Sequence, residues 1–389
     1  MPLADPTVTV LTRQDELDAL APAWDALWHR TPGASAFQHH GWVAAWARHH
    51  VDDGDLRVAV ATRGDDLVAA VPLHLDRRGP WAVLSPLGGV VTDITDLLVE
   101  PGFSAWDSVT GALRRRPGWC SIDLPEVLPG AAAQEWARSW PGAVQRWTAS
   151  TFLTLPVASA QPVEALLARA PGRTANTLRR KLRKVAAAGV AERRVPAEDV
   201  LPAVASFLTL HEAQWAGRGV VPAHLTDTFR AFLVDALRRL VADDVAVLTE
   251  FSVDGDVLLS QIDLITQDAL AYYLAGISPR LRQLLDTSCL LVSHDVTLAA
   301  DRGAVTYSML RGDEDYKMRW RPDMTRSERL VLGRPGSLAG RAHIIAAASR
   351  RAAASVVHRG RARLPELGAR LRPAPRNSDD VASPLGARG

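Results

Sequence analysis

Cysteine is scarce in this sequence of 389 residues, which contains Cys120 and Cys289 and no others. Two cysteines cannot build the disulfide framework of a small secreted domain, and they fit a reducing compartment. The sequence has no CxxC pair and no cluster of Cys with His, so we predict no metal site. We expect a cytoplasmic protein whose fold rests on a hydrophobic core.

Long apolar runs and a strong net charge are also absent. No apolar stretch reaches the ~18 residues of a membrane-spanning helix, and the first residues lack the segments of a signal peptide. The formal net charge of +2 predicts no particular partner. From Val331 onward, however, eleven Arg stand against three acidic residues. We expect residues 336–389 to form a basic tail, partly helical and otherwise disordered, with at most weak peripheral contact to anionic membranes.

The sequence predicts a similar order of helices and strands twice. Apolar periodicity predicts the order β-α-α-β-β-β-α-β-α-β-β for the first half, with its last two strands at Ala143–Trp147 and Phe152–Leu155. A similar α/β order begins again after the loop-like segment Pro156–Pro162. We therefore predict two α/β domains, residues 1–157 and 158–335.

The second half includes a basic helix, Arg173–Gly189, a helix over Leu281–Asp301 and a strand over Val305–Leu310. No aromatic residue is interleaved with the basic ones, which favours a solvated helix face over a nucleic-acid surface. The strand Val305–Leu310 leads directly to Gly312 and to charged and phenolic groups. Because α/β proteins hold ligands at the carboxyl ends of strands, this segment is the first candidate for chemistry. A plain charged loop is the alternative.

Four stretches of the sequence carry a resemblance to a known family. They are FQHHGWVAAWARHH from Phe37, RTANTLRRKLRKVAAAGV from Arg173, YYLAGISP from Tyr272 and SMLRGDEDYKMRW from Ser308. In this order they resemble the CelD-like (cellulose-biosynthesis) acetyltransferases of the GNAT superfamily, which are related to the Fem-type tandem-GNAT peptidyltransferases. The resemblance implies an α/β fold of two tandem GNAT-like domains with mixed central sheets, and an acyl-CoA site in the second domain.

The same resemblance implies an N-acyltransferase with acetyl-CoA as co-substrate. GNAT enzymes cradle the CoA pyrophosphate with a Gly-rich loop whose backbone N–H groups face the ligand. Here the matching segment, ISPRLRQLLDTS, contains no Gly. We expect Ser278, Arg280 and Arg282 to bind phosphate in its place. A pocket that no longer binds CoA is the alternative.

Tyr316 and Asp263 are the catalytic candidates. In GNAT enzymes a tyrosine near the end of the fifth strand can protonate the departing thiolate, and a phenol of pKa ~10 can supply a proton to a thiolate of pKa ~8.5. Packing alone is the competing interpretation of Tyr316. Asp263 lies on a hairpin strand beside the presumed cofactor strand, where it would serve as base for the acceptor amine unless strand alternation turns it away.

Arg311, Asp313 and Lys317 are the candidates for binding an anionic group of the substrate. The alternative is structural, with Asp313 capping the next helix and Arg311 paired with it. Asp93 and Asp96 are three residues apart, which favours a turn cap over a place in the cleft between the halves.

Histidine adds no further predicted site. His39-His40 and His49-His50 are adjacent pairs, and neighbours on a helix diverge by roughly 100°, so neither pair predicts a metal site. A single helical histidine such as His211 is more often structural than catalytic.

The sequence therefore favours acyl transfer, acetyl in the first instance, from CoA to an amine such as an amino sugar or an envelope precursor. Two alternatives stay open. One is a Fem-type aminoacyltransferase that uses charged tRNA, and the other is a non-catalytic binding protein on a degenerate GNAT fold. Tight binding of CoA would separate the first function from the other two.

Overall fold

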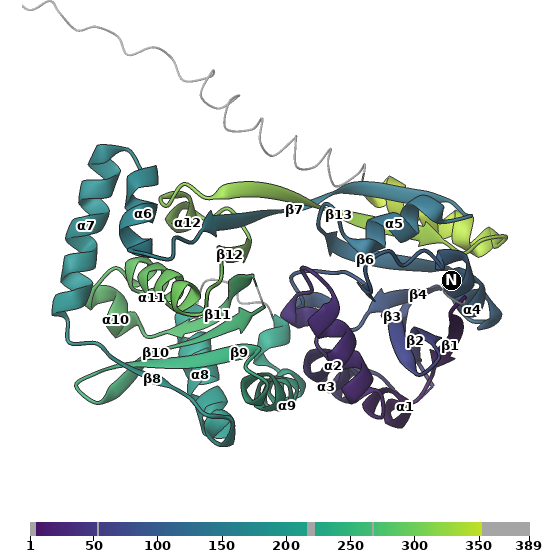
Figure 1. Cartoon of the computed structure of the whole chain (residues 1–389), viewed down its shortest axis with the longest axis horizontal. Coiled ribbons are helices and arrows are strands. Elements are labelled where there is room, and N and C mark those ends of the chain that lie inside the picture. Colours follow the sequence, from purple (N-terminus) through teal and green to yellow (C-terminus); the bar gives the residue numbers. More distant parts are fainter. Residues whose placement is uncertain (1–4, 53, 216–221, 267, 352–389) are drawn as a thin grey trace, which may run out of the picture. The chain divides into compact units, whose positions relative to one another are not determined.

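The computed structural model describes residues 5–52, 54–215, 222–266 and 268–351 (Figure 1). Residues 1–344 form one compact unit. Most of the predicted basic tail lies outside the described residues. Within those residues, no helix combines the length and the apolar content that crossing a membrane requires.

The first half holds five helices and seven strands in its described residues. The helices are α1 (Gln14–Asp18), α2 (Ala21–Arg30), α3 (His40–His50), α4 (Trp106–Arg115) and α5 (Ala132–Ser139). The strands are β1 (Thr7–Leu11), β2 (Leu56–Arg63), β3 (Asp66–Arg78), β4 (Trp81–Pro86), β5 (Leu98–Val99), β6 (Ser121–Val127) and β7 (Val144–Pro156).

The second half continues the alternation of helices and strands. Its helices are α6 (Pro162–Arg169), α7 (Gly172–Ala187), α8 (Val200–Trp215), α9 (Asp227–Ala242), α10 (Pro279–Leu284), α11 (Thr287–Asp301) and α12 (Asp315–Met318). Its strands are β8 (Ala191–Arg194), β9 (Ala246–Val253), β10 (Asp256–Ile265), β11 (Ala269–Ile277), β12 (Thr306–Arg311) and β13 (Asp323–Gly333).

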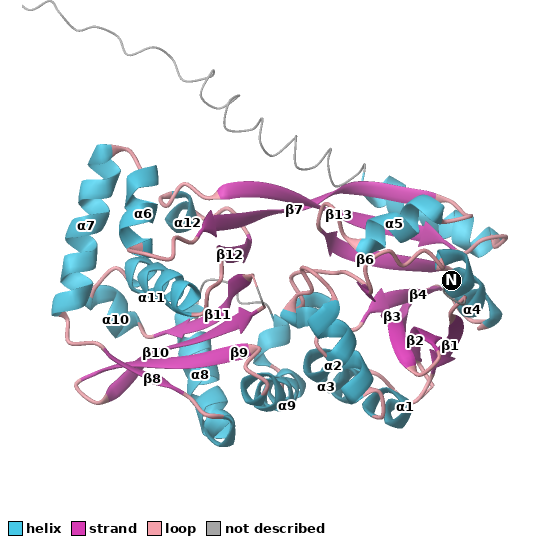
Figure 2. Ribbon diagram, viewed as in Figure 1, coloured by secondary structure: helices cyan, strands magenta, loops and turns pink. Residues whose placement is uncertain are grey.

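One mixed sheet of thirteen strands runs through the described part of both halves (Figure 2). Its order is β1-β2-β3-β4-β6-β13-β7-β12-β11-β10-β9-β8, and β5 pairs with β3. The strand β13 comes last in the chain, yet it pairs with β6 and β7 of the first half; Figure 1 shows β7 and β13 side by side. The predicted α/β class with a mixed sheet is confirmed, whereas the predicted boundary at residue 157 stays a prediction.

Two of the predicted elements differ from the structure. The runs Ala143–Trp147 and Phe152–Leu155, predicted as two strands, form the single strand β7. The prediction was wrong because polar residues interrupt the apolar pattern there, while β13 pairs with this part of β7 and completes the ladder. The predicted helix Leu281–Asp301 is divided into α10 and α11, with a break at Leu285 and Asp286.

A shared aromatic core joins the two halves. The indole ring of Trp42 on α3 lies 5.0 Å from the ring of Phe232 on α9 and 5.4 Å from the ring of Tyr273 on β11, both edge to face. All three side chains are buried in one hydrophobic cluster. Edge-to-face ring pairs stabilise a packed core beyond the burial of apolar surface, and they favour one relative orientation of the rings. The contact between Trp42 and Tyr273 therefore holds β11 against the first half.

A second close contact fixes β11 against α8. A Cβ atom added at Gly276 would lie 2.5 Å from the carbonyl oxygen of Phe207 and 2.8 Å from the backbone nitrogen of His211. Both neighbours are backbone atoms of α8, which cannot move aside without shifting the helix. The absence of a side chain at Gly276 therefore sets the distance between helix and strand.

We predict that Gly276→Ala lowers the free energy of unfolding by about 1–3 kcal/mol, the usual cost of forcing an extra methyl group into a packed interior. Urea unfolding followed by circular dichroism would measure it. Gly172→Ala is the matched control, because a Cβ there meets open space at the start of α7. Equal unfolding midpoints for the two variants would contradict the packing argument.

Candidate functional site

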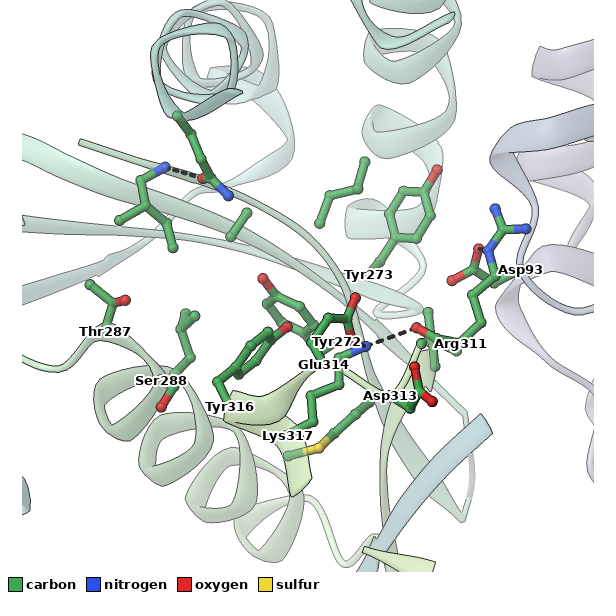
Figure 3. A pocket seen from close by; sticks show the side chains of 18 of the residues that line it. Asp93, Tyr272, Tyr273, Thr287, Ser288, Arg311, Asp313, Glu314, Tyr316 and Lys317 are labelled. Carbon is green, nitrogen blue, oxygen red and sulfur yellow. Dashed lines mark hydrogen bonds and ion pairs between the residues drawn. The ribbon is translucent and has the colours of Figure 1, made fainter. Parts of the chain in front are cut away.

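A pocket opens where the parallel strands β11 and β12 diverge. They pair only from Ala269 opposite Thr306 to Ala271 opposite Ser308, while the other edge of β12 pairs with β7 from Thr306 to Arg311. The gap leads into a cavity of about 1010 Å³, lined mainly by β11, β12 and the segments that follow them. Figure 3 shows the side chains around it.

Irregular backbone on both strands widens this gap. The pairing of β10 with β11 shifts register at Ile262, which leaves Tyr273 as an extra residue on β11. The pairing of β12 with β7 shifts between Ser308 and Arg311, where Leu310 has a φ of 53°. Left-handed backbone at a leucine is sterically costly and persists only where its surroundings impose it. The end of β12 is thus a strained turn into the pocket.

Two side chains of α8 hold backbone groups of β11 at the pocket. The ring nitrogen Nδ1 of His211 donates to the carbonyl oxygen of Ala275 over 3.0 Å. The Oε1 atom of Gln214 accepts from the N–H of Ile277 over 2.8 Å. Because β11 has no strand partner on its β12 edge beyond Ala271, these side chains take the place of a neighbouring strand on that edge. His211 also lines the cavity.

A cluster of charged groups ties the first half to the end of β12. Asp93 lies within 2.6 Å of Arg311, measured from carboxylate Oδ1 to Nε. The ammonium group of Lys317 donates to the carbonyl oxygen of Arg311 over 2.8 Å and pairs with Glu314 at 2.9 Å. Asp93 and the Lys317 side chain are buried. Arg311 therefore pairs with Asp93, not with Asp313 as the structural alternative predicted.

Asp93 has a carboxyl group whose pKa is raised toward neutral pH. Burial raises its pKa to about 6, and the charges of Arg311 and Lys317 oppose that rise without cancelling it. A carboxylate with such a pKa can accept a proton near neutral pH, which an ordinary surface aspartate does poorly.

Tyr316 on α12 projects into the same cavity, close to Tyr272 (Figure 3). Burial and the neighbouring Glu314 carboxylate raise the pKa of the Tyr316 phenol above its ordinary value, while the charge of Arg282 lowers it. The phenol therefore keeps its proton at neutral pH. It is available as a hydrogen-bond and proton donor toward the cavity.

The opposite end of the pocket is rich in cations, yet a carboxylate occupies its centre. Asp286 caps α11 by accepting from the N–H of Cys289, and it binds Lys181 Nζ at 2.6 Å and Arg319 Nη1 at 3.1 Å. Burial acts to raise the pKa of Asp286, but these hydrogen bonds outweigh it and hold the pKa well below the usual range. Thr287 lines the cavity beside it. An entering phosphate group would have to compete with Asp286.

The structure brings together some of the predicted site residues. Tyr316, Arg282, Arg311, Asp313 and Lys317 all line the cavity. Asp313 is exposed there, and α12 begins after Glu314 without a side-chain cap. The predicted cap by Asp313 is therefore wrong.

Ser278 and Arg280 are not among the residues that line the cavity. The hydroxyl of Ser278 caps the short helix α10. The guanidinium of Arg280 pairs with Asp256 at 2.7 Å, near the turn between β9 and β10. Asp263 is also absent from the lining, because it lies fully buried against α11 and accepts from Gln261. Asp263 therefore does not reach the pocket, although its cross-strand partner Tyr272 lines it.

Sequence reasoning missed three polar residues of the pocket. Asp93 was assigned to a turn, His211 to structure, and His224 was not considered; all three line the cavity. Burial lowers the pKa of His224 to about 4. Only Asp93 could have been noticed from the sequence, since it follows an apolar Gly-containing run. No local pattern, however, connects that run to Arg311.

Residues 172–318 match the family model of the Acetyltransferase (GNAT) domain. The match begins at α7 and includes all of α12, so it contains the strands, helices and turn that build most of the pocket. No curated protein matches the sequence. The chain thus carries a GNAT acetyltransferase domain in its second half, and its general chemistry is acyl transfer.

Solved structures with the same fold include FemX, at 12% identity and a TM-score of 0.58, covering 80% of this chain and 95% of that chain. A putative lysylphosphatidylglycerol synthetase domain from Agrobacterium fabrum has 13% identity and a TM-score of 0.53, covering 86% and 96%. The L-PGS of Bacillus licheniformis has 12% identity and a TM-score of 0.51, covering 85% and 95%. At these identities the likeness establishes the fold alone, and it extends over both halves.

We predict that Asp286→Asn tightens the binding of inorganic pyrophosphate roughly tenfold, because it removes one like charge and releases Lys181 and Arg319. Asparagine still caps a helix, so α11 should stay intact. Calorimetric titration of both proteins would measure the change. Asp256→Asn changes the net charge equally at Arg280, outside the pocket, and should leave the affinity unaltered; an equal gain there would argue against a local effect.

Proposed function

We propose that this protein is an N-acyltransferase that takes an acyl group, acetyl in the first instance, from CoA and passes it to an amine held in the pocket. The observation that carries the proposal is the pocket between the diverging strands β11 and β12, within the stretch that matches the GNAT family. An amino sugar or an envelope precursor is the acceptor class that the CelD-like resemblance suggests. We place the reaction in the cytoplasm, in keeping with two buried free cysteines.

The open edge of β11 suits a thioester donor. Beyond Ala271 it has no strand partner on the β12 side, and an extended amide-containing chain can pair there as an added strand. Backbone N–H groups along that edge would polarise the thioester carbonyl. Gln214 already accepts from the N–H of Ile277, so a donor that reaches this position would exchange one neutral acceptor for another.

Two side chains can accept and supply the protons that the transfer requires. The acceptor nitrogen attacks the thioester carbon, a C–N bond forms, and the C–S bond breaks. The nitrogen loses a proton to Asp93, and the thiolate takes a proton from Tyr316. Asp93 is preferred as base over His224, because its pKa lies nearer to neutral pH.

A charged tRNA is a second candidate donor, favoured by a separate observation on α7. Five of its basic side chains are exposed, while Lys181 on the same helix reaches Asp286 at the pocket. The five are Arg173, Arg179, Arg180, Arg183 and Lys184. A row of cations beside a pocket attracts a polyanion such as tRNA. The Fem-type enzymes that the sequence resembles use charged tRNA as donor.

The test is the release of free CoA thiol from acetyl-CoA in the presence of a panel of amines and amino sugars.

We predict that Tyr316→Phe lowers turnover by roughly tenfold or more, which is the low end of a general-acid contribution, with an unchanged melting temperature. Tyr272→Phe removes a neighbouring phenol from the same cavity. A larger loss in Tyr272→Phe would reassign the acid. No release with any amine, together with transfer from charged tRNA, would replace CoA by RNA as the donor.

We predict a fall in kcat/KM as pH drops below about 6, since a base must be ionised and the pKa of Asp93 is raised to about 6. Asp93→Asn should remove this acid limb and lower the plateau. Asp96→Asn is the matched control: burial raises the pKa of Asp96 to about 6 as well, but its carboxylate accepts from the N–H groups of Leu97 and Ala133 and lies outside the pocket lining. An acid limb lost in Asp96→Asn instead would contradict the role of Asp93.

A further inference from the structure

A polar cluster lies buried between the sheet and α11, and none of its residues lines the pocket. It consists of Gln261 and Asp263 on β10 together with His294 and Asp295 on α11. The side chains of Gln261, Asp263 and Asp295 are fully buried, and the His294 side chain is 7% exposed. Apolar residues of α11 and the neighbouring strands form a hydrophobic cluster on the same elements. We call it the buried carboxylate cluster.

The two carboxylates of the cluster receive only neutral hydrogen bonds from the described residues. The Nε2 atom of Gln261 donates to both oxygens of Asp263 at 2.7 Å and to Oδ1 of Asp295. The hydroxyl of Tyr307 donates to Oδ2 of Asp295. No Lys or Arg of the described chain pairs with either carboxylate. Two neighbouring carboxylates in an apolar interior are costly unless a cation or protons compensate them.

Two further polar atoms of the cluster lack partners. His294 Nε2 and Gln261 Oε1 are buried and have no hydrogen bond to any residue that the structure describes. Buried polar atoms in native proteins are almost always paired, so each such atom calls for an explanation. Both can donate an electron pair to a metal ion.

The spacing of these groups suits one small cation. One ligand atom each from Asp263, His294 and Asp295 lies within 4.8 Å of the others. A zinc ion binds such atoms at ~2.0–2.2 Å, which holds ligands ~3.3–3.6 Å apart. Side-chain shifts on the order of 1 Å would therefore close the site around the ion.

The surroundings of His294 match those of a metal ligand. Its Nδ1 lies 3.1 Å from the carboxylate of Glu192 on β8, which leaves Nε2 as the inward nitrogen. A histidine that binds a metal through one nitrogen typically donates through the other to a carboxylate, which fixes the ring and raises its basicity. His294 and Glu192 also line a surface groove of about 450 Å³, through which an ion can enter.

We propose that Asp263, His294 and Asp295 bind a divalent transition-metal ion, with Zn²⁺ as the best match, and that Gln261 supplies the fourth ligand. The Gln261 amide would turn over so that Oε1 faces the ion, a change that interchanges two atoms of nearly equal shape. One imidazole with oxygen ligands suits Zn²⁺ better than Ca²⁺ or Mg²⁺. The ion joins β10 to α11, and its role is structural.

The test uses the full-length chain, stripped with a chelator and dialysed into metal-free buffer. Calorimetric titration with Zn²⁺ alone should give one ion per chain with a Kd below roughly 1 μM, and metal analysis after gel filtration should find the same ratio. Asp295→Asn and His294→Ala should each weaken binding by at least 100-fold. Glu192→Gln, which disturbs only the outer partner of His294, should weaken it by roughly 10- to 100-fold.

His39→Gln is the matched control. Asp25, His39 and Asp243 form the other described group with metal-like spacing, but Arg239 pairs with both of its carboxylates. This variant should keep one ion per chain with unchanged affinity. Loss of the ion in His39→Gln would place the site elsewhere and overturn the assignment.

Two other results would also overturn the proposal. One is a wild-type Kd above roughly 100 μM, which would leave protons as the compensating charge. The other is binding by Asp295→Asn and His294→Ala within threefold of wild type, which would mark an adventitious surface site. If these variants do not fold by circular dichroism, the visible spectrum of the Co²⁺-loaded wild type decides: intense bands of a four-coordinate ion support the site, and the weak spectrum of hydrated Co²⁺ rejects it.

Discussion

The pocket depends on one strand, β12, whose two edges are paired over different lengths. On one edge β12 pairs with β11 only from Thr306 to Ser308, and on the other edge it pairs with β7 from Thr306 to Arg311. Beyond Ser308 the edge that faced β11 is open, and β11 and β12, the two walls of the pocket, separate. β7 belongs to the first half and is held on its other edge by β13. The first half therefore holds the wall of the pocket that β12 forms.

This arrangement separates the charges of the pocket into two ends. At one end, Asp93 of the first half meets Arg311 at the strained end of β12. At the other end, Lys181 and Arg319 surround Asp286 at the start of α11. A donor with phosphate groups and an acceptor with an amine favour opposite ends of such a pocket, since each seeks the charge opposite to its own. The reacting groups would then meet between them, near Tyr316.

Much of the fold follows from the sequence, because periodic apolar residues report the burial of one face. The strand that ends at Leu310 and the helices around it were predicted on that basis. The unity of β7 was not, since polar residues between Trp147 and Phe152 are held by pairing with β13, some 175 residues away. Local composition carries no information about such a partner.

The site residues divide in the same way. Tyr316, Arg311 and Lys317 lie within one short segment, so the sequence alone grouped them. Asp93 reaches the pocket only through an ion pair with a residue 218 positions later, which no local pattern encodes. Asp263 was misplaced for a different reason: it is fully buried, although its cross-strand partner Tyr272 lines the pocket, and a strand pattern does not tell how deeply each residue is covered.

Three buried carboxylates of this chain, those of Asp123, Asp93 and Asp263, differ in the cations that they meet. Asp123 bonds to both Arg78 and Arg329, and these outweigh burial and lower its pKa. Asp93 pairs with Arg311, and burial raises its pKa to about 6 although the charges of Arg311 and Lys317 oppose the rise. Asp263 meets no Lys or Arg among the described residues, and burial raises its pKa well above the usual range. The described residues thus place no Lys or Arg beside the buried carboxylate cluster, whereas two arginines compensate the charge of Asp123. A bound cation would compensate the cluster in the same way.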